Sequence, residues 1–251
     1  MKKVILINKK EGETPLQALE YFRLKNKEYK NLPMTYAGRL DPMACGLLLV
    51  LAGEETKNKE KYLSLDKEYE FSILFGFFTD TYDILGKVID NKNFNISEIG
   101  LRKNIIQILP SFLGNRIQKY PIYSSKTVDG VPLFMYARNS KDVEIPEREV
   151  CIKSLKLIKI KKINKEKLFF NIEKRINKVQ GDFRQKEIIK IWNKKGNDKK
   201  IQERFFIASF KIKCTSGTYV RSISNEIGEK LSIPALAFSI KRTKIGRFSL
   251  S

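Results

Sequence analysis

The alternating segment between Tyr69 and Phe75 constrains the fold of this chain more than any other feature. Tyr69, Phe71, Ile73 and Phe75 share one face of an extended backbone, and the intervening residues share the other. Such a period of two, with an apolar and aromatic face, is typical of a strand packed on a core. The chain is therefore expected to contain a β-sheet.

Helix and strand patterns elsewhere mix without regular alternation, which predicts an α+β fold. Thr14, Pro15 and Gln17 form the start of a helix with a capping box. The expected strands are 4–7, 46–52, 69–75, 151–161, 167–172 and 205–214, and the further expected helices are 97–109, 183–192 and 220–231. Residues 118–148 are expected to be a long loop with a short helix, and 194–200 a charged linker. The length of 251 residues allows one large domain with a single sizeable core, or two small domains.

The chain has no histidine, which excludes Ser-His-Asp triads, Cys-His pairs and histidine metal sites. Proton transfer is left to Asp, Glu, Lys, Tyr, Cys or water. Its three cysteines, Cys45, Cys151 and Cys214, are widely spaced and form no C-x-x-C motif, as expected for reduced thiols in a cytoplasmic protein. The longest apolar run, 47–52, is too short to span a membrane, and the N-terminus is not a signal peptide. We expect no metal and no membrane partner.

Positive charge is concentrated in one part of the chain. Residues 151–213 hold 20 Lys and Arg against 6 Asp and Glu, within a net charge of +21 for the whole chain. This distribution favours a polyanionic partner such as a nucleic acid. The alternatives are a solvated lysine-rich surface and, less favoured because no long basic amphipathic helix is evident, an anionic membrane.

The most unusual segment is 36–46, where Gly38, Ala44 and Gly46 surround Asp41. An Asp before a proline is most often a turn or helix-cap residue. The small neighbours also let a ligand approach the backbone closely, which makes the carboxylate a candidate for chemistry.

Two further segments carry candidate groups. Tyr69 stands near the start of its strand, where a tyrosine usually packs at the rim of the core but also stacks on a base or moves a proton. Arg221 lies off the apolar stripe of the helix predicted at 220–231, and a lone Arg in that position is most often an exposed surface cation.

Together these segments resemble the TruB family of pseudouridine synthases. Residues 38–42 (GRLDP) with 46–48 (GLL) are similar to its catalytic-aspartate motif, and 67–69 (KEY) followed by 79–83 (TDTYD) and Gly86 are similar to its second motif. Residues 214–223 (CTSGTYVRSI) match the third. Residues 8–12 loosely match its opening element, and residues 240–242 fit its late element. The matches are collinear over nearly the whole chain.

The resemblance implies a pseudouridine synthase fold and the isomerisation of a uridine in RNA to pseudouridine, most specifically uridine 55 in the T-loop of tRNA. Asp41 is implied as the nucleophile, with Arg221 as its ion-pair partner and Tyr69 packed on the everted base. Whether Asp41 attacks the base or the sugar, or first assists elimination at the sugar, stays open. No cofactor is required, and a monomer suffices.

The resemblance also implies an RNA-contacting insertion at 118–148 within one catalytic domain, 1–251. The residues implied to bind substrate are Tyr219, Ile240, Tyr36, Arg39, Lys9, Lys126, Tyr123 and Arg138. Lys9 is expected to support the site more than to act in the chemistry.

Three departures from the family pattern stand out. Tyr36 replaces a usual histidine, Lys10 replaces a usual proline, and the chain ends soon after 240–242, where a C-terminal RNA-binding (PUA) domain is expected to be absent. The lysine-rich 151–213 stretch is expected to compensate electrostatically for that domain. The alternatives are an RNA-binding folding factor with little catalysis, a synthase acting on ribosomal RNA, and an unrelated basic α+β domain.

Overall fold

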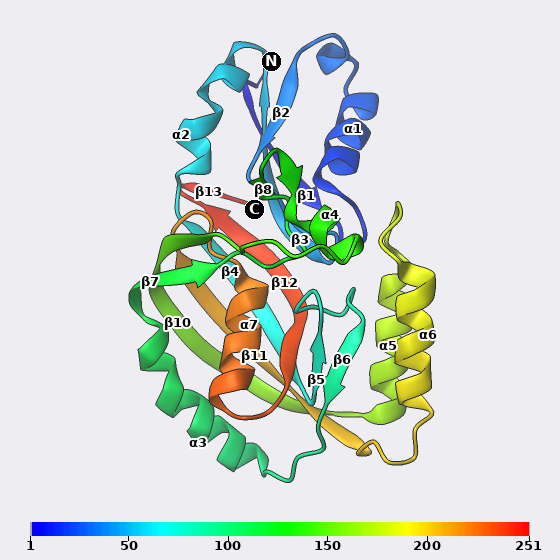
Figure 1. Ribbon diagram of the computed structural model, residues 1–251. Helices are drawn as coiled ribbons and strands as arrows, with labels where there is room; N and C mark the ends of the chain where they lie inside the picture. The colour runs from blue at the N-terminus through cyan, green and yellow to red at the C-terminus, as the bar shows by residue number, and fades with distance from the viewer. Residues whose placement is uncertain (1, 251) are drawn as a thin grey trace.

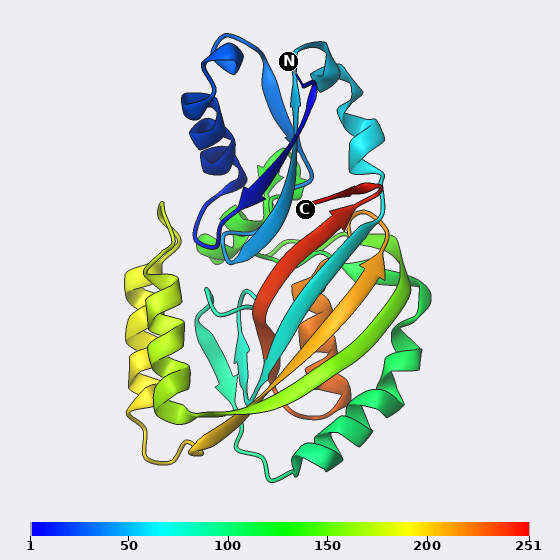
Figure 2. The ribbon, with the colours of Figure 1, turned by 180° about the vertical axis from the view of Figure 1, so that it is seen from behind.

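The computed structural model describes residues 2–250, and within them nine strands form one mixed sheet (Figures 1 and 2). The main path, in sheet order, is β1 (Val4–Lys9), β3 (Ala44–Ala52), β12 (Ala235–Ile245), β4 (Lys67–Phe75), β11 (Arg204–Cys214), β10 (Glu147–Asn164) and β7 (Gly114–Lys119). Two short strands, β2 (Met34–Ala37) and β13 (Phe248–Ser249), pair with β3 and β12. Only the β12–β3 pair is parallel among the strand pairs of the described chain. The predicted α+β class is confirmed, and the sheet is largely antiparallel.

Seven α-helices, counted over residues 2–250, surround this sheet. They are α1 (Pro15–Lys25), α2 (Lys59–Leu63), α3 (Glu98–Ile108), α4 (Leu133–Arg138), α5 (Lys165–Ile176), α6 (Gln185–Gly196) and α7 (Val220–Lys230). The predicted capping box of α1 is present: the Thr14 hydroxyl accepts from the Gln17 amide at 3.2 Å, and the Gln17 side chain accepts from the Thr14 amide at 2.7 Å.

The sheet is covered on both faces because β4 is apolar on both. Phe71, Ile73 and Phe75 pack with α3 and α7 in one core cluster. Leu74 points the other way and joins a second cluster with α5, α6 and the small sheet formed by β5 (Phe77–Thr79) and β6 (Val88–Asn91). The alternation along β4 thus divides its side chains between two core clusters, one on each face of the sheet.

The N-terminal lobe, residues 2–63, is the upper end of the molecule in Figure 1. Here α1 packs on β1 and β3 through Ala18, Leu19 and Leu48. On the other face of β3, Leu47, Leu49 and Leu51 meet Tyr62 of α2. This lobe continues the same sheet, so its loops hold fixed positions relative to β4 and β12.

Residues 118–148, here called the insertion, cross the front of the molecule at mid-height (Figure 1). They contain the two-residue strands β8 (Thr127–Val128) and β9 (Val131–Pro132) and the short helix α4. The buried side chain of Leu133 anchors α4. A long loop with a short helix was expected in this region and is found.

Two expectations about secondary structure are wrong. Residues 167–172 belong to helix α5, since Leu168, Phe169, Ile172 and Ile176 form one buried helical face while Phe170 is 69% exposed. The expected linker at 194–200 begins inside α6, which continues to Gly196. Strand β12 was not predicted from periodicity, although it lies at the centre of the sheet.

Candidate active site

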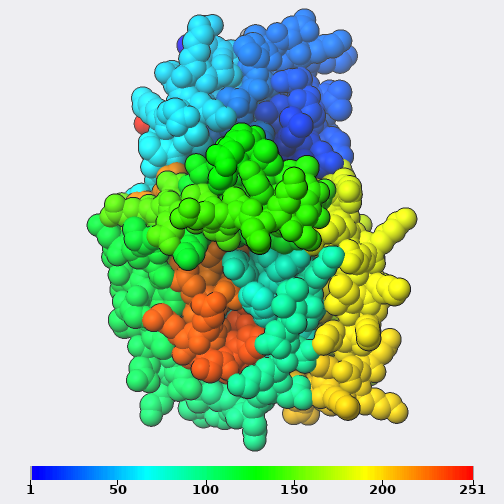
Figure 3. All heavy atoms as spheres, in the orientation of Figure 1, coloured from blue at the N-terminus to red at the C-terminus, as the bar shows by residue number. Residues whose placement is uncertain are grey.

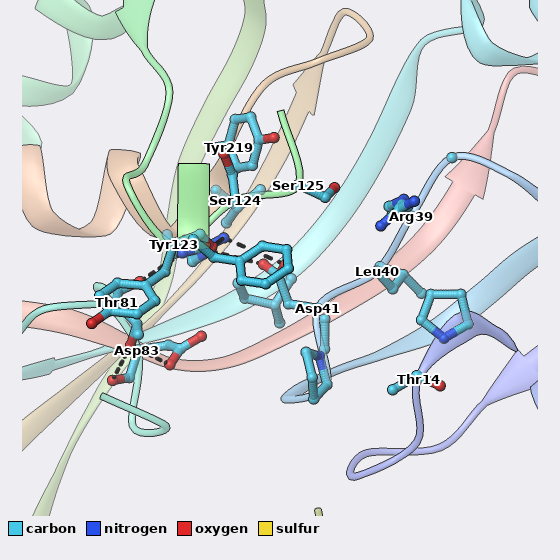
Figure 4. A pocket seen from close by; sticks show the side chains of 18 of the residues that line it. Thr14, Arg39, Leu40, Asp41, Thr81, Asp83, Tyr123, Ser124, Ser125 and Tyr219 are labelled. Carbon is cyan, nitrogen blue, oxygen red and sulfur yellow. Dashed lines mark hydrogen bonds and ion pairs between the residues drawn. The ribbon is translucent and has the colours of Figure 1, made fainter. Parts of the chain in front are cut away.

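A cleft of about 780 Å³ lies between the N-terminal lobe and the lower part of the sheet. The insertion runs across the front of the molecule at this height (Figure 3). The cleft draws its walls from segments far apart in sequence: the start of α1, the loop before β3, the turn after β5, the insertion, and the loop before α7. In Figure 4 Asp41 lies near the middle, with Tyr123, Thr81 and Asp83 on one side and Arg39 and Thr14 on the other.

Asp41 and Arg221 form an ion pair at this centre. The Arg221 Nε donates to Asp41 Oδ2 at 2.8 Å, and Nη2 donates to Oδ1 at 3.4 Å. The Arg221 side chain is 3% exposed, whereas that of Asp41 is 38% exposed. The carboxylate therefore faces the cleft with a fully buried cation behind it. The reading of Arg221 as an exposed surface cation is excluded.

The remaining Arg221 donors bind backbone carbonyls. Nη1 donates to Thr81 O at 2.9 Å and Nη2 to Tyr123 O at 2.9 Å. One guanidinium thus joins the Asp41 loop, the turn after β5 and the insertion. A planar group with five donors in a fixed geometry suits this role, which the single nitrogen of Lys could not fill.

Asp83 lies beside this pair. It is 7% exposed, and its Oδ1 accepts from the Thr81 hydroxyl at 2.8 Å and the Leu85 amide at 2.9 Å. Burial raises the pKa of this carboxyl group to about 6, with Arg221 opposing the shift and Asp41 adding to it. Asp83 lies within the segment similar to the second family motif, but it was not named from the sequence as a site residue.

Two buried cations hold the Asp41 loop from behind. Lys9, with no exposed surface, donates to the carbonyls of Lys10 at 3.0 Å, Pro42 at 3.4 Å and Ala44 at 2.5 Å. Burial lowers the pKa of Lys9 to about 8. Lys9 was expected among the substrate-binding residues, but its amino group is directed at these carbonyls, and it does not line the cleft.

Arg242 of β12 is the second cation and was not singled out by residue in the sequence analysis. It is 1% exposed and donates to Gly38 O at 3.0 Å, Arg39 O at 3.0 Å and Leu47 O at 2.8 Å. The backbone at 38–47 therefore has fixed partners on both sides. This arrangement sets the position of Asp41 before any ligand enters.

Further side chains named from the sequence line the cleft: Tyr36, Arg39, Tyr69, Tyr219 and Ile240. Burial raises the pKa values of Tyr69 and Tyr219, so both rings are neutral phenols at pH 7. Tyr219 is fixed by Gln118, whose side chain accepts from its amide at 2.8 Å and donates to its carbonyl at 3.3 Å.

The insertion contributes Tyr123 and Arg138 to the cleft lining, but not Lys126. Lys126 is exposed, with its amino group 5.6 Å from the centre of the Tyr120 ring. Among the cleft residues that were not named from the sequence are two arginines that no motif marks: Arg184, and Arg148, whose side chain lies against the backbone of Gly217.

Neither a candidate metal site nor a candidate membrane span is found among residues 2–250. Among residues 2–250 no cluster of three or more His, Cys, Asp or Glu side chains could hold a metal ion. No helix in that part of the chain combines the length and hydropathy needed to cross a bilayer.

Comparison with known proteins gives consistent similarities. A sequence model of the TruB family pseudouridylate synthase N-terminal domain matches residues 24–178. The tRNA pseudouridine synthase B of Borreliella burgdorferi (strain ZS7) is 31% identical over 248 residues, covering 98% of this chain and 70% of that protein. The enzyme of the same name from Fusobacterium nucleatum is 31% identical over 250 residues, covering 100% and 70%.

Solved structures share the fold at lower identity. A chain in the crystal structure of a Cbf5–Nop10–Gar1 complex superposes with a TM-score of 0.58 at 18% identity, covering 99% of this chain. A chain in an H/ACA RNP bound to a substrate RNA containing 2′-deoxyuridine gives 0.56 at 17% identity, covering 99%. This chain spans about half the length of those two, 50% and 49%.

Proposed function

The chain belongs to the TruB family of pseudouridylate synthases, and from this premise we propose that it isomerises uridine 55 in the T-loop of tRNA. Family membership gives the reaction class, which is RNA pseudouridine synthesis. The N1–C1′ glycosidic bond breaks, a C5–C1′ bond forms, the proton leaves C5 and N1 gains one, so the product is an isomer. The choice of tRNA is supported by the names of the curated relatives.

The observation that carries the proposal is the Asp41–Arg221 pair at the centre of the cleft. A volume of about 780 Å³ is within the range of small-molecule sites and admits an everted nucleotide. Asp41 Oδ2 is held at 2.8 Å, whereas Oδ1 makes only the 3.4 Å contact and keeps lone pairs for a substrate. In the proposed reaction Asp41 is the nucleophile, and the positive charge of Arg221 balances the negative charge of the Asp41 carboxylate.

The walls of the cleft suit an everted pyrimidine. Tyr69, Tyr219 and Ile240 line the cleft and offer flat and apolar surfaces for the base. Because burial raises the pKa of Tyr69, its hydroxyl group is protonated. It can therefore accept the C5 proton only if it gives up its own hydroxyl proton at the same time. We propose that Tyr69 packs on the base and takes part in this late proton transfer.

The RNA around the everted base is proposed to be held by the insertion and by basic side chains at the cleft mouth. Arg39, Tyr36 and Arg138 line the cleft and supply hydrogen bonds and charge for phosphates. Lys126 lies outside the cleft on the insertion and is proposed to meet the RNA there. One chain supplies every group named, so we propose that the working unit is a monomer and that it acts in the cytoplasm.

The test is to incubate the purified protein with an unmodified tRNA transcript and map pseudouridine by chemical sequencing. We expect product at the T-loop uridine with the wild-type protein, and a loss of at least about 10⁴-fold with Asp41→Asn, since a carboxamide is not a nucleophile. Circular dichroism checks that the variant is folded. Arg221 keeps its bonds to Thr81 and Tyr123 in that variant, so a folded protein is expected.

Two results would contradict the proposal. Equal product from wild type and Asp41→Asn would remove the nucleophile from the reaction. Product in a ribosomal RNA transcript but not in tRNA would retain the chemistry and overturn the substrate.

A further inference from the structure

A helical hairpin occupies the place of a tight turn between two neighbouring strands. The antiparallel ladder of β10 and β11 ends at Asn164 opposite Arg204. Such neighbours are usually joined by about 2 to 5 residues. Here residues 165–203 instead form α5 and α6, which pack on each other through Phe169 and Trp192 with ring centres 6.0 Å apart. An element of this size at a turn position needs its own explanation.

The tip of this hairpin forms part of the cleft. Asp182, Phe183 and Arg184 line it. Arg184 Nη1 donates to Asp80 Oδ2 at 2.8 Å and to the Tyr123 hydroxyl at 2.7 Å, and its guanidinium lies 4.2 Å from the Tyr123 ring centre. The hairpin therefore contacts the insertion directly and closes one side of the site.

Beyond the tip, α6 presents a row of free lysines. Lys186, Lys190 and Lys194 recur every four residues and are all exposed, opposite the buried Ile188 and Trp192. None of the three has an ion-pair partner within residues 2–250. We call these three residues the α6 stripe. In Figure 3 the yellow segment that contains it projects long side chains away from the body.

The neighbouring acidic residues do not neutralise the stripe. Glu187 pairs with Lys87 at 2.6 Å, and Glu173 of α5 accepts from Asn193 at 3.4 Å. Helix α5 also exposes Phe170, 69% accessible, between the exposed Lys167 and Lys174. Basic residues interleaved with an exposed aromatic ring are typical of nucleic-acid surfaces.

We infer that the α5–α6 hairpin is a second RNA-contacting arm, whose α6 stripe binds the phosphate backbone of the RNA that enters the cleft. Successive lysines of the stripe are about 6 Å apart along the helix axis, comparable to the separation of neighbouring phosphates on a strand. The stripe begins two residues after Arg184, so it continues outward from the cleft lining. This inference rests on the proposed function in that the ligand is the same RNA.

The test compares two variants with the same loss of charge. The first is Lys186→Gln/Lys190→Gln/Lys194→Gln. The control is Lys25→Gln/Lys27→Gln/Lys30→Gln, three exposed lysines at and beyond the far end of α1 from the cleft. The dissociation constant for an unmodified tRNA transcript is measured at several salt concentrations, together with the single-turnover rate at saturating enzyme.

We expect the stripe variant to bind tRNA at least about tenfold more weakly at low salt and to lower the slope of log K against log salt by about 2 to 3. The loss should appear in the dissociation constant and not in the rate at saturation. The control should stay within about twofold of wild type in affinity. Identical behaviour of the two variants would overturn the inference, because net charge alone would then explain binding.

The outcomes separate this inference from the proposed function. A stripe-dependent salt slope together with no pseudouridine from the wild-type protein would uphold the arm and refute the enzyme. Pseudouridine formation with an unaltered slope would do the opposite. Unchanged tRNA binding combined with lost binding to vesicles of anionic phospholipid would assign the stripe to a membrane surface and overturn the inference.

Discussion

At the scale of single residues, the burial of Asp83 should make the stability of the protein depend on pH. Burial raises the pKa of this carboxyl group from 3.8 to about 6. The native protein then binds the Asp83 proton more tightly than the unfolded chain does. The contribution of Asp83 to stability is therefore most favourable below about pH 4 and is lost as the pH rises toward 6.

Asp83→Asn should remove this dependence. Between pH 4 and pH 7 the free energy of unfolding of the variant should rise relative to wild type by about 2 kcal/mol. Burial of the carboxamide changes the free energy of unfolding by the same amount at every pH, so it does not affect this pH dependence. Urea denaturation of both proteins at pH 4, 5.5 and 7 measures the difference. Parallel stability curves over that interval would show that Asp83 titrates normally.

At the scale of elements, the parallel contact between β3 and β12 depends on one glycine. Gly46 faces Arg242 in the β3–β12 register and has φ +98°, and a Cβ atom there would lie 2.3 Å from the carbonyl oxygen of Arg242. Any side chain at this position must push the two strands apart. The same strands carry the Asp41 loop and the Arg242 cation that holds it.

Gly46→Ala should therefore destabilise the protein by about 3 kcal/mol or more. Gly53→Ala is the matched control, since Gly53 has φ +61° with nothing within 4 Å of an added Cβ. It should cost about 1 kcal/mol from the left-handed backbone alone. Equal shifts in the urea midpoints of the two variants would mean that the close strand contact is not rigid.

Elements with a regular period were mostly predictable, with the exception of α5, whose helical face was predicted as a strand at 167–172. Strand β4 alternates from Tyr69 to Ile73, and α1 carries its own capping box. In contrast, β12 has register shifts near Ala237 and Arg242 against β4, which interrupt the period of two. Its buried Arg242 also departs from the apolar pattern of a core strand; its charge is accommodated by the carbonyls of Gly38, Arg39 and Leu47.

The site was predictable to the extent that family motifs name its residues. Asp41, Tyr69, Tyr219 and Arg221 were placed in one cleft by motif resemblance, and the geometry brings them together. Arg184 carries no motif, and only the folded hairpin brings it to Tyr123. Local sequence holds no signal for a contact between residues that far apart.

At the scale of the whole molecule, contacts around the cleft join the N-terminal lobe, the α5–α6 hairpin and the insertion. The sheet alone does not connect these three parts. The Gly12 amide donates to Pro42 O at 2.8 Å, and the Gln180 amide donates to Gly12 O at 3.0 Å. Arg175 of the hairpin binds Glu11 of the N-terminal lobe, with its Nη2 2.7 Å from Oε2. Arg184 completes the series by joining the hairpin to the insertion.

Arg184→Ala should remove this contact between the hairpin and the insertion. It removes charge-assisted hydrogen bonds worth about 1.5 kcal/mol each, so local opening should become at least about tenfold more frequent. Hydrogen exchange of amides within 123–138 measures that change, with amides of β4 as an internal reference that should not move. Equal protection of 123–138 in the variant and wild type would show that the insertion is held by its other contacts alone.

Arg184→Gly separates the side chain from the backbone in this prediction. Arg184 has φ 63°, a left-handed conformation that alanine retains at a cost of about 1 kcal/mol and that glycine adopts freely. Both variants should therefore lose protection in 123–138 to the same extent, while the glycine variant unfolds at the higher urea concentration. If Arg184→Gly preserved the protection, backbone strain at the hairpin tip, and not the guanidinium, would govern how the insertion closes on the cleft.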